Sequence, residues 1–166
     1  DIVATPTGFL STVLDANGNQ TATLVASGSN RRAVTIDEIP KNLQHAFVAI
    51  EDERFYEHNG IDVTGIIRAG VKGVASGFHF SEGASTITQQ LLKNTVFTSW
   101  TSESSMADKF ERKFQEQYLA LQLEKVVDKD WILENYLNAI NLGQNTLGVG
   151  VASERYFGKD VSDLTL

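Results

Sequence analysis

Cysteine is absent from this chain of 166 residues, proline occurs twice and methionine once. Without a thiol the protein cannot form a disulfide, bind zinc through cysteine or use a cysteine nucleophile. No apolar run approaches the roughly 18 residues that a membrane-spanning helix needs, so none is predicted. Positive charge is also scarce, since 14 Lys and Arg residues stand against 21 Asp and Glu residues. The resulting net charge of −7 argues against a general nucleic-acid binder.

The rest of the composition is that of an ordinary folded domain. Apolar residues make up 42% of the chain and charged residues 21%, which argues against disorder. A chain of this length suits one domain better than two. It begins at Asp1 with neither a methionine nor a signal peptide, which indicates an excised fragment rather than a complete gene product.

Two β-prone segments, residues 9–14 and 21–25, flank a sequence in which Asn17-Gly18 suits a tight turn. We expect a small hairpin there. From Thr35 onward the spacing of apolar residues is helical, and neither an internal repeat nor an alternation of helices and strands appears. The sequence therefore predicts a mainly α-helical domain behind a short β-hairpin.

Six helices are predicted from the apolar spacing and from helix-end signals. The first begins near Pro40, ends at Asn59-Gly60 and turns inward a stripe formed by Leu43, Ala46, Phe47 and Ile50. The second covers about 66–75 and the third follows Gly83. The last three are expected at about 106–126, 131–140 and 148–157, with Asp128 or Asp130 capping the fifth. The inward-facing residues of the fourth are expected to be Phe110, Phe114 and Leu121.

Three segments carry residues that could perform chemistry. The first is acidic and begins at Glu51, one position past the apolar stripe, where partial burial would suit a general base. A plainer interpretation is a solvated acidic helix end, because charged residues are mostly exposed.

The second segment opens with Gly83-x-Ser85-Thr86, which places backbone N–H groups and hydroxyls at a helix N-terminus, a favourable position for phosphate. Lys93 follows Thr86 by about two helical turns. A capped amphipathic helix with a surface lysine is the alternative, although the paired Gln89 and Gln90 are unusual on such a helix.

In the third segment Arg112 and Glu116 are i, i+4 neighbours, with Lys109 one turn earlier. A carboxylate beside cations suits a site for an anionic leaving group. The alternative is an exposed ion pair worth under about 1 kcal/mol. The three histidines, at positions 45, 58 and 79, lack the spacing of metal ligands.

Five segments form an ordered set of motifs. They are Glu51-Asp52-x-x-Phe55-x-x-His58-x-Gly60, Gly83-x-Ser85-Thr86-Ile87-Thr88-Gln89-Gln90-Leu91-x-Lys93-Asn94, Arg112-Lys113-x-x-Glu116, Ile132-Leu133-Glu134-x-Tyr136-Leu137-Asn138, and Gly148-Val149 through Tyr156-Phe157-Gly158-Lys159. This set resembles the peptidoglycan glycosyltransferase domain, glycosyltransferase family 51, found in class A penicillin-binding proteins and monofunctional transglycosylases. The resemblance extends from about Thr35 to Leu166.

The resemblance implies a lysozyme-like helical glycosyltransferase domain at residues 35–166, truncated at its C-terminal end. Residues 1–34 would then be a hairpin and linker from a membrane anchor outside this chain. The implied activity is the polymerisation of lipid II into β-1,4 glycan strands, with inversion at the anomeric carbon.

By the same resemblance, Glu51 is the general base and Glu116 the second catalytic carboxylate. Lys93, Arg112 and Lys113 would stabilise the polyprenyl diphosphate leaving group. Lys109 stands in for an arginine that some relatives have before the third motif. The substrate-binding residues implied by the match are Asp52, Phe55, His58, Gly83, Ser85, Thr86, Gln89, Gln90, Lys93, Asn94, Lys109, Arg112 and Lys113.

The implied partners are lipid II, the growing glycan chain on polyprenyl diphosphate, a membrane surface and other cell-wall synthesis proteins, with no nucleic acid. The implied location is the extracytoplasmic face of the bacterial cell membrane. Phe78 and Phe80, in a short apolar stretch between the first two motifs, are expected to contact the bilayer interface, with burial in the core as the alternative. A divalent cation, Mg²⁺ or Mn²⁺, could assist the diphosphate, but the sequence reveals no ligand set for one.

Two other functions stay open at this point. A lysozyme-like glycan hydrolase also uses two carboxylates in a helical cleft, although it has no diphosphate for a cationic cluster to neutralise. A non-catalytic helical interaction module would tolerate the loss of Glu51.

Overall fold

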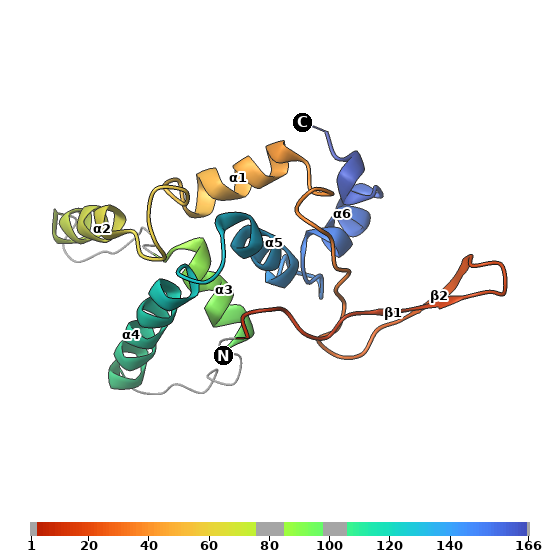
Figure 1. The fold of residues 1–166 in the computed structure, drawn as a ribbon, viewed down its shortest axis with the longest axis horizontal. Helices are drawn as coiled ribbons and strands as arrows, with labels where there is room; N and C mark the ends of the chain where they lie inside the picture. The colour runs from red at the N-terminus through yellow and green to blue at the C-terminus, as the bar shows by residue number, and fades with distance from the viewer. Residues whose placement is uncertain (1–2, 76–84, 98–105, 166) are drawn as a thin grey trace.

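The structure is a computed structural model that describes residues 3–75, 85–97 and 106–165, without the side chains of residues 72–75 and 106–109. Over this range the chain is mainly helical and has one two-stranded sheet (Figure 1). The elements are β1 Ser11–Leu14, β2 Gln20–Leu24, α1 Lys41–Glu51, α2 Val63–Ala75, α3 Ile87–Thr95, α4 Met106–Leu123, α5 Lys129–Ala139, α6 Val149–Phe157 and the short 3₁₀ helix η1 Val161–Asp163. The expected fold class, a mainly helical domain with a short N-terminal hairpin, is confirmed.

The hairpin follows from its turn chemistry. Asp15 Oδ1 accepts hydrogen bonds from the backbone N–H groups of Asn17 and Asn19, both at 2.8 Å. The antiparallel strand β1 lies within the first predicted segment, and β2 begins one residue before the second. Every residue of both strands is exposed, and Figure 1 shows the hairpin extending away from the helices.

The segment after the hairpin is fastened to α5 by buried hydrogen bonds. Arg31 is 6% exposed, and its Nε donates to the backbone oxygen of Asn138 at 2.7 Å. The Asn138 side chain accepts from Val34 N at 3.0 Å and donates to Val34 O at 2.7 Å. Residues 31–34 therefore contact the helical body, and the division of the chain between residues 34 and 35 stays a prediction.

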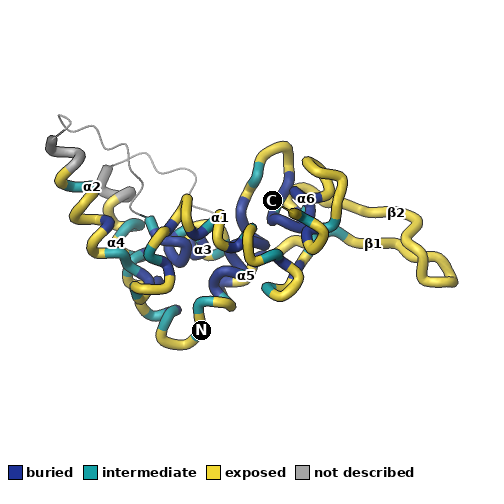
Figure 2. The backbone as a smooth tube through the Cα atoms, turned by 90° about the horizontal axis from the view of Figure 1, so that it is seen from above, coloured by how far each residue is buried: buried dark blue, intermediate teal, exposed yellow. Residues whose placement is uncertain are grey.

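Helix α3 packs against both α4 and α5, and Figure 2 shows buried backbone concentrated around α3 and α5. Helices α3 and α5 each begin with a side-chain cap. Thr86 Oγ1 accepts from Gln89 N at 3.2 Å at the start of α3, and Asp128 Oδ1 accepts from Trp131 N at 2.8 Å at the start of α5. The third and fifth predicted helices are therefore confirmed, and Asp128 is the cap of the fifth. Their fully buried apolar side chains are Ile87, Leu91, Leu92, Ile132, Leu133 and Leu137.

Helix α1 turns a different face to the core from the one that the apolar spacing predicted. Ile50 is 81% exposed and Ala46 is also exposed, whereas Gln44 and Val48 are buried. Gln44 can occupy a buried position because its Nε2 donates to the backbone oxygen of Ile36 at 2.9 Å. The predicted inward stripe is therefore wrong at Ala46 and Ile50.

The predicted end of this helix at Asn59-Gly60 is also wrong. Helix α1 ends at Glu51, because Asp52 leaves the helical conformation with φ −160° and ψ 73°. Glu51 consequently lies on the last turn of the helix, and Asp52 begins an irregular loop that leads to α2.

Helix α4 likewise exposes the side chains that were expected to face inward. Phe110 is 62% exposed, Phe114 70% and Leu121 38%, while Glu116 and Ala120 are buried. The physical reason is that a carboxylate with cationic partners occupies the buried face, which a count of apolar residues does not register. Figure 2 shows the exposed outer surface of α2 and α4 at one end of the molecule.

Gly60 brings the loop after α1 very close to α4. Its φ is +92°, and a Cβ at this position would lie 2.6 Å from the backbone oxygen of Ala120. Gly60→Ala is therefore expected to lower the free energy of unfolding by about 2 kcal/mol or more, measured by chemical denaturation. Gly70→Ala in α2 is the matched control, because its Cβ would meet nothing within 4 Å. Equal stabilities of the two variants would contradict this view of the loop.

Candidate active site

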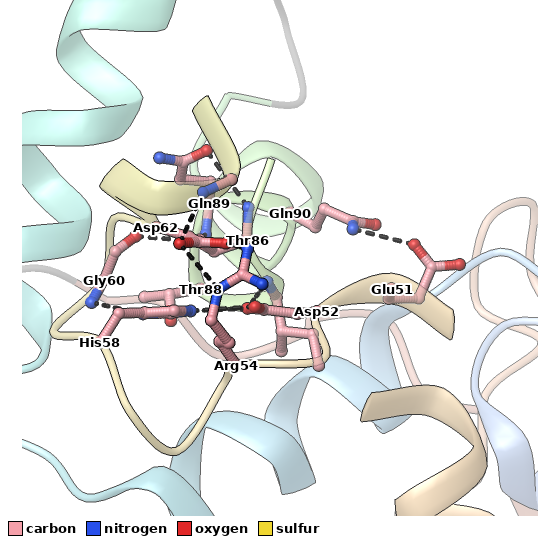
Figure 3. Close-up of polar contacts among 12 residues, drawn as sticks. Glu51, Asp52, Arg54, His58, Gly60, Asp62, Thr86, Thr88, Gln89 and Gln90 are labelled. Atoms are coloured by element: carbon pink, nitrogen blue, oxygen red, sulfur yellow. Dashed lines mark hydrogen bonds and ion pairs between the residues drawn. The ribbon is translucent and has the colours of Figure 1, made fainter. Parts of the chain in front are cut away.

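Buried Asp52 joins the loop after α1 to the start of α3 (Figure 3). Its Oδ2 accepts from Ile87 N at 3.0 Å, and both of its carboxylate oxygens lie 3.0 Å from His58 Nε2. His58 Nδ1 accepts from Gly60 N at 3.2 Å, so Nε2 carries the proton and donates to Asp52. Asp52 and His58 therefore hold the loop against the N-terminus of α3.

Glu51 lies beside this junction and is exposed, so the expected partial burial is wrong. Its Oε2 accepts from Gln90 Nε2 at 3.0 Å (Figure 3). It lines a cavity of about 230 Å³ that is also lined by Ser85 and Thr86. A carboxylate in this position can exchange protons with solvent while it faces a bound molecule.

A buried carboxylate on α4 holds two cations. Glu116 is 1% exposed and forms ion pairs with Arg112 and with Lys113, whose Nζ lies 2.9 Å from Glu116 Oε2. Lys113 Nζ also donates to Ser85 Oγ at 2.8 Å, which connects α4 to the segment before α3. We call Lys93, Arg112 and Lys113 the cationic cluster.

Two members of the cationic cluster, Lys93 and Lys113, line a second cavity of about 190 Å³. Ser85 lines both cavities, and Gln90 lines the second while it donates to Glu51. The structure therefore brings the predicted base and two of the three predicted cations, Lys93 and Lys113, to adjoining cavities that meet at Ser85. The residues lining the second cavity are Ser85, Gln89, Gln90, Lys93, Asn94, Lys113 and Glu116.

Thr86 and Gln89 form the capping box of α3, which also leaves a donor for a ligand. Thr86 Oγ1 donates to Gly60 O at 2.8 Å, so this hydroxyl serves the fold. Gln89 Oε1 accepts from Thr86 N at 3.3 Å, whereas its buried Nε2 has no hydrogen-bond partner among the described residues. Because Gln89 lines the second cavity, this amide can donate to an oxygen of a bound anion.

Two arginines near Glu51 escaped the sequence analysis. Arg54 pairs with Asp62 and with Glu53 at 2.5 Å, and Arg68 pairs with Glu53 at 2.6 Å. The hydrogen bond from Arg54 is the main reason that the pKa of Asp62 lies below its usual value. All four residues line the cavity that contains Glu51. Arg54 occupies an unspecified position of the first motif, in the loop after α1, and Arg68 lies on α2, outside the motifs. The sequence therefore gave no signal for either arginine.

Phe55 serves the core rather than either cavity. It is fully buried, and Lys129 Nζ lies 4.5 Å from its ring centroid. The same Nζ donates to His58 O at 2.7 Å and pairs with Glu124 at 2.6 Å, while the Thr88 hydroxyl donates to Glu124. Lys129 and Glu124 therefore hold the loop after α1 against the start of α5. Neither residue was singled out by a motif.

Several predicted residues lie outside the described part of the chain. Phe78, Phe80 and Gly83 are among them, as is the side chain of Lys109, and their roles stay predictions. In the described ranges, no group of three or more histidine and acidic side chains could hold a metal ion. No helix within the same ranges has both the length and the apolarity to cross a bilayer.

Comparison with known proteins bears out the motifs. Residues 17–166 match the family described as Transglycosylase. Penicillin-binding protein 1A of Clostridium perfringens (strain 13 / Type A) is 52% identical over 145 residues, which cover 86% of this chain and 20% of that protein. Penicillin-binding protein 1A of Escherichia coli (strain K12) is 49% identical over 140 residues, 84% of this chain and 16% of that protein. The chain thus spans a fifth or less of the length of these relatives. Because the family match covers most of its length, the chain belongs to the transglycosylase family, as its five ordered motifs indicated.

Proposed function

We propose that this domain is a peptidoglycan glycosyltransferase that polymerises lipid II into β-1,4 glycan strands with inversion at the anomeric carbon. The observation that carries the proposal is the placement of Glu51 in one cavity and of Lys93 and Lys113 in an adjoining cavity that shares Ser85 with it. An inverting transfer needs a base on the side of the acceptor and positive charge on the side of an anionic leaving group. The similarity to penicillin-binding proteins 1A supports this substrate class.

In the proposed reaction Glu51 activates the acceptor. The 4-hydroxyl of the GlcNAc in an incoming lipid II is a poor nucleophile at neutral pH. Glu51 therefore takes the proton of this hydroxyl as the hydroxyl oxygen bonds to the anomeric carbon of the donor. The hydrogen bond from Gln90 holds Oε2 of Glu51 and leaves Oε1 to face the hydroxyl. The exposed carboxylate then returns the proton to solvent.

The cationic cluster acts on the leaving group. As the bond from the anomeric carbon to the diphosphate oxygen breaks, the electron pair stays on the diphosphate, and Lys93 and Lys113 meet the added negative charge. Gln89 Nε2 is a further donor to the diphosphate oxygens. Glu116 is 1% exposed and pairs with two cations, so its role in this scheme is to align Arg112 and Lys113.

The polyprenyl tail requires that the domain works at a membrane surface, on the extracytoplasmic face where peptidoglycan is made. Helix α2 suits this contact, because Ile67 and Val71 are 62% and 65% exposed. The same helix contributes Gly65 and Arg68 to the cavity that contains Glu51. A tail resting along α2 would therefore begin next to the reacting sugar.

Replacing Ile67 and Val71 together with serine is expected to weaken sedimentation with phospholipid vesicles at least about tenfold, because their apolar area no longer enters the bilayer interface. The control is Leu24→Ser with Val126→Ser, since these two side chains are 62% and 76% exposed outside α2. Equal vesicle binding by the two double variants would remove α2 from the membrane contact.

The proposed activity is tested by incubating the protein with labelled lipid II and separating the products by gel electrophoresis. The proposal expects long glycan strands, and it expects the phosphoglycolipid inhibitor moenomycin to prevent their formation. Preformed cell wall serves as the second substrate. Release of soluble fragments from it, without polymer from lipid II, would favour a glycan hydrolase instead.

A further inference from the structure

Tyr136 on α5 lies behind the candidate base, with its ring buried and its hydroxyl pointing toward α3. The residue is 2% exposed, and its ring packs edge-on against Phe47, with the ring centroids 6.3 Å apart. Phe47 precedes Glu51 by one turn of α1. The hydroxyl of Tyr136 donates to Gln90 Oε1 at 3.4 Å. No motif analysis assigned a function to this tyrosine.

The amide of Gln90 connects the two residues. Its oxygen accepts from Tyr136, and its nitrogen donates to Glu51 Oε2 at 3.0 Å (Figure 3 shows the second contact). If the amide were turned over, its oxygen would face the carboxylate oxygen of Glu51, and the two acceptors would repel each other. A hydroxyl that donates to the amide oxygen therefore favours the orientation in which Gln90 supports an ionised Glu51.

We infer that Tyr136 is a positioning residue, which fixes the Gln90 amide so that Gln90 holds one oxygen of the Glu51 carboxylate. The inference rests on the proposed function, in which Glu51 is the base. Tyr136 lines neither of the two cavities, so in this role it acts through Gln90.

The surroundings of Tyr136 keep its phenol protonated, so that it can donate to Gln90. Burial, with a smaller contribution from the charge of Glu51, raises the pKa of the Tyr136 phenol, so the hydroxyl remains a donor. Charged groups from several elements line the two cavities near Glu51. They are Asp52, Glu53, Arg54 and Asp62 from the loop after α1, Arg68 from α2, and, in the adjoining cavity, Lys93 from α3 with Lys113 and Glu116 from α4. Removal of the hydroxyl leaves all of these groups in place.

Tyr136→Phe is the decisive variant, because it keeps the ring contact with Phe47 and deletes the hydroxyl alone. The pH dependence of kcat/KM for polymerisation is measured for this variant and for the wild-type protein. The acidic midpoint is expected to move to higher pH by about half a unit, since the ionised carboxylate loses part of its support. Tyr156→Phe is the matched control, as it removes a hydroxyl that donates to Leu142 O at 2.8 Å on the other side of the fold.

Gln90→Met provides the second arm of the experiment. If Tyr136 acts through Gln90, Tyr136→Phe moves the midpoint in the wild-type background and leaves it unchanged in the Gln90→Met background. An unchanged midpoint in the wild-type background, with a normal melting temperature, overturns the inference. Three outcomes are distinguishable. If the wild-type protein makes no polymer from lipid II, the proposed function fails, and if Glu51→Gln retains activity, the role of Glu51 as the base fails. If Glu51→Gln is inactive and the Tyr136→Phe midpoint does not move, the positioning role of Tyr136 alone is overturned.

Discussion

Replacing Glu51 with glutamine is expected to lower the rate of lipid II polymerisation by about 10²- to 10⁴-fold, the range that general acid–base catalysis contributes. The amide keeps the size of the side chain and can still meet Gln90, but it cannot take the proton of the acceptor hydroxyl. Because Glu51 is exposed, the melting temperature is expected to stay close to that of the wild-type protein. The measurement is the initial rate of strand formation from labelled lipid II.

Glu57→Gln is the matched control for this variant. Glu57 lies in the same acidic segment and is also exposed, so it shares the charge of Glu51 without its place at the cavity. It is expected to polymerise lipid II at the wild-type rate. A similar loss in both variants would attribute the effect to general acidity of the segment, and undiminished activity of Glu51→Gln would remove the base from the scheme.

Glu116→Gln is expected to have the largest effect on stability and to reduce activity as well. The change removes the carboxylate charge that pairs with Arg112 and Lys113, at a position where Glu116 itself is 1% exposed. Breaking a buried ion pair from one side costs about 3–5 kcal/mol. Because the Lys113 side chain is 42% exposed and can be solvated, we expect the lower end, about 3 kcal/mol in the free energy of unfolding.

Chemical denaturation measures this loss, and Glu111→Gln on the same helix provides the control. Glu111 is exposed and contacts Gln115 at 3.1 Å, so its replacement is expected to change the free energy of unfolding by less than about 0.5 kcal/mol. Full stability of Glu116→Gln would show that the carboxylate does not hold the cations.

The sequence predicted the start of α6 to within one residue, and it placed α3 and α5, whose apolar faces are fully buried, in the expected segments. Residues of α3 and α5 follow the 3.6-residue period, and Asp128 marks the start of α5 as expected. The faces of α1 and α4 could not be predicted in the same way, because Gln44 and Glu116 occupy buried positions through specific polar partners. Gln44 is paired with a backbone oxygen before the helix, and Glu116 with two cations on its own helix. The spacing of apolar residues does not reveal such pairs, so it assigns both positions to the surface.

The sequence predicted the residues that line the candidate site, but not the residues that hold them in position. The motifs named Glu51, Gln90 and Lys113, which the structure brings to adjoining cavities. They did not include Lys129, and the fourth motif included Tyr136 without assigning it a role. These two residues act through partners far away in the sequence: Lys129 bonds to His58 and Tyr136 to Gln90. Such pairings depend on how α5 packs beside α3, which the period of a single helix does not encode.

A crystal structure with a diphosphate-linked disaccharide bound to this domain tests the central claim most directly. The account predicts that the diphosphate oxygens contact the ammonium groups of Lys93 and Lys113, with a sugar hydroxyl within hydrogen-bond distance of Glu51. A diphosphate seated instead on Arg54 and Arg68, with Glu51 turned away from every sugar hydroxyl, would contradict it.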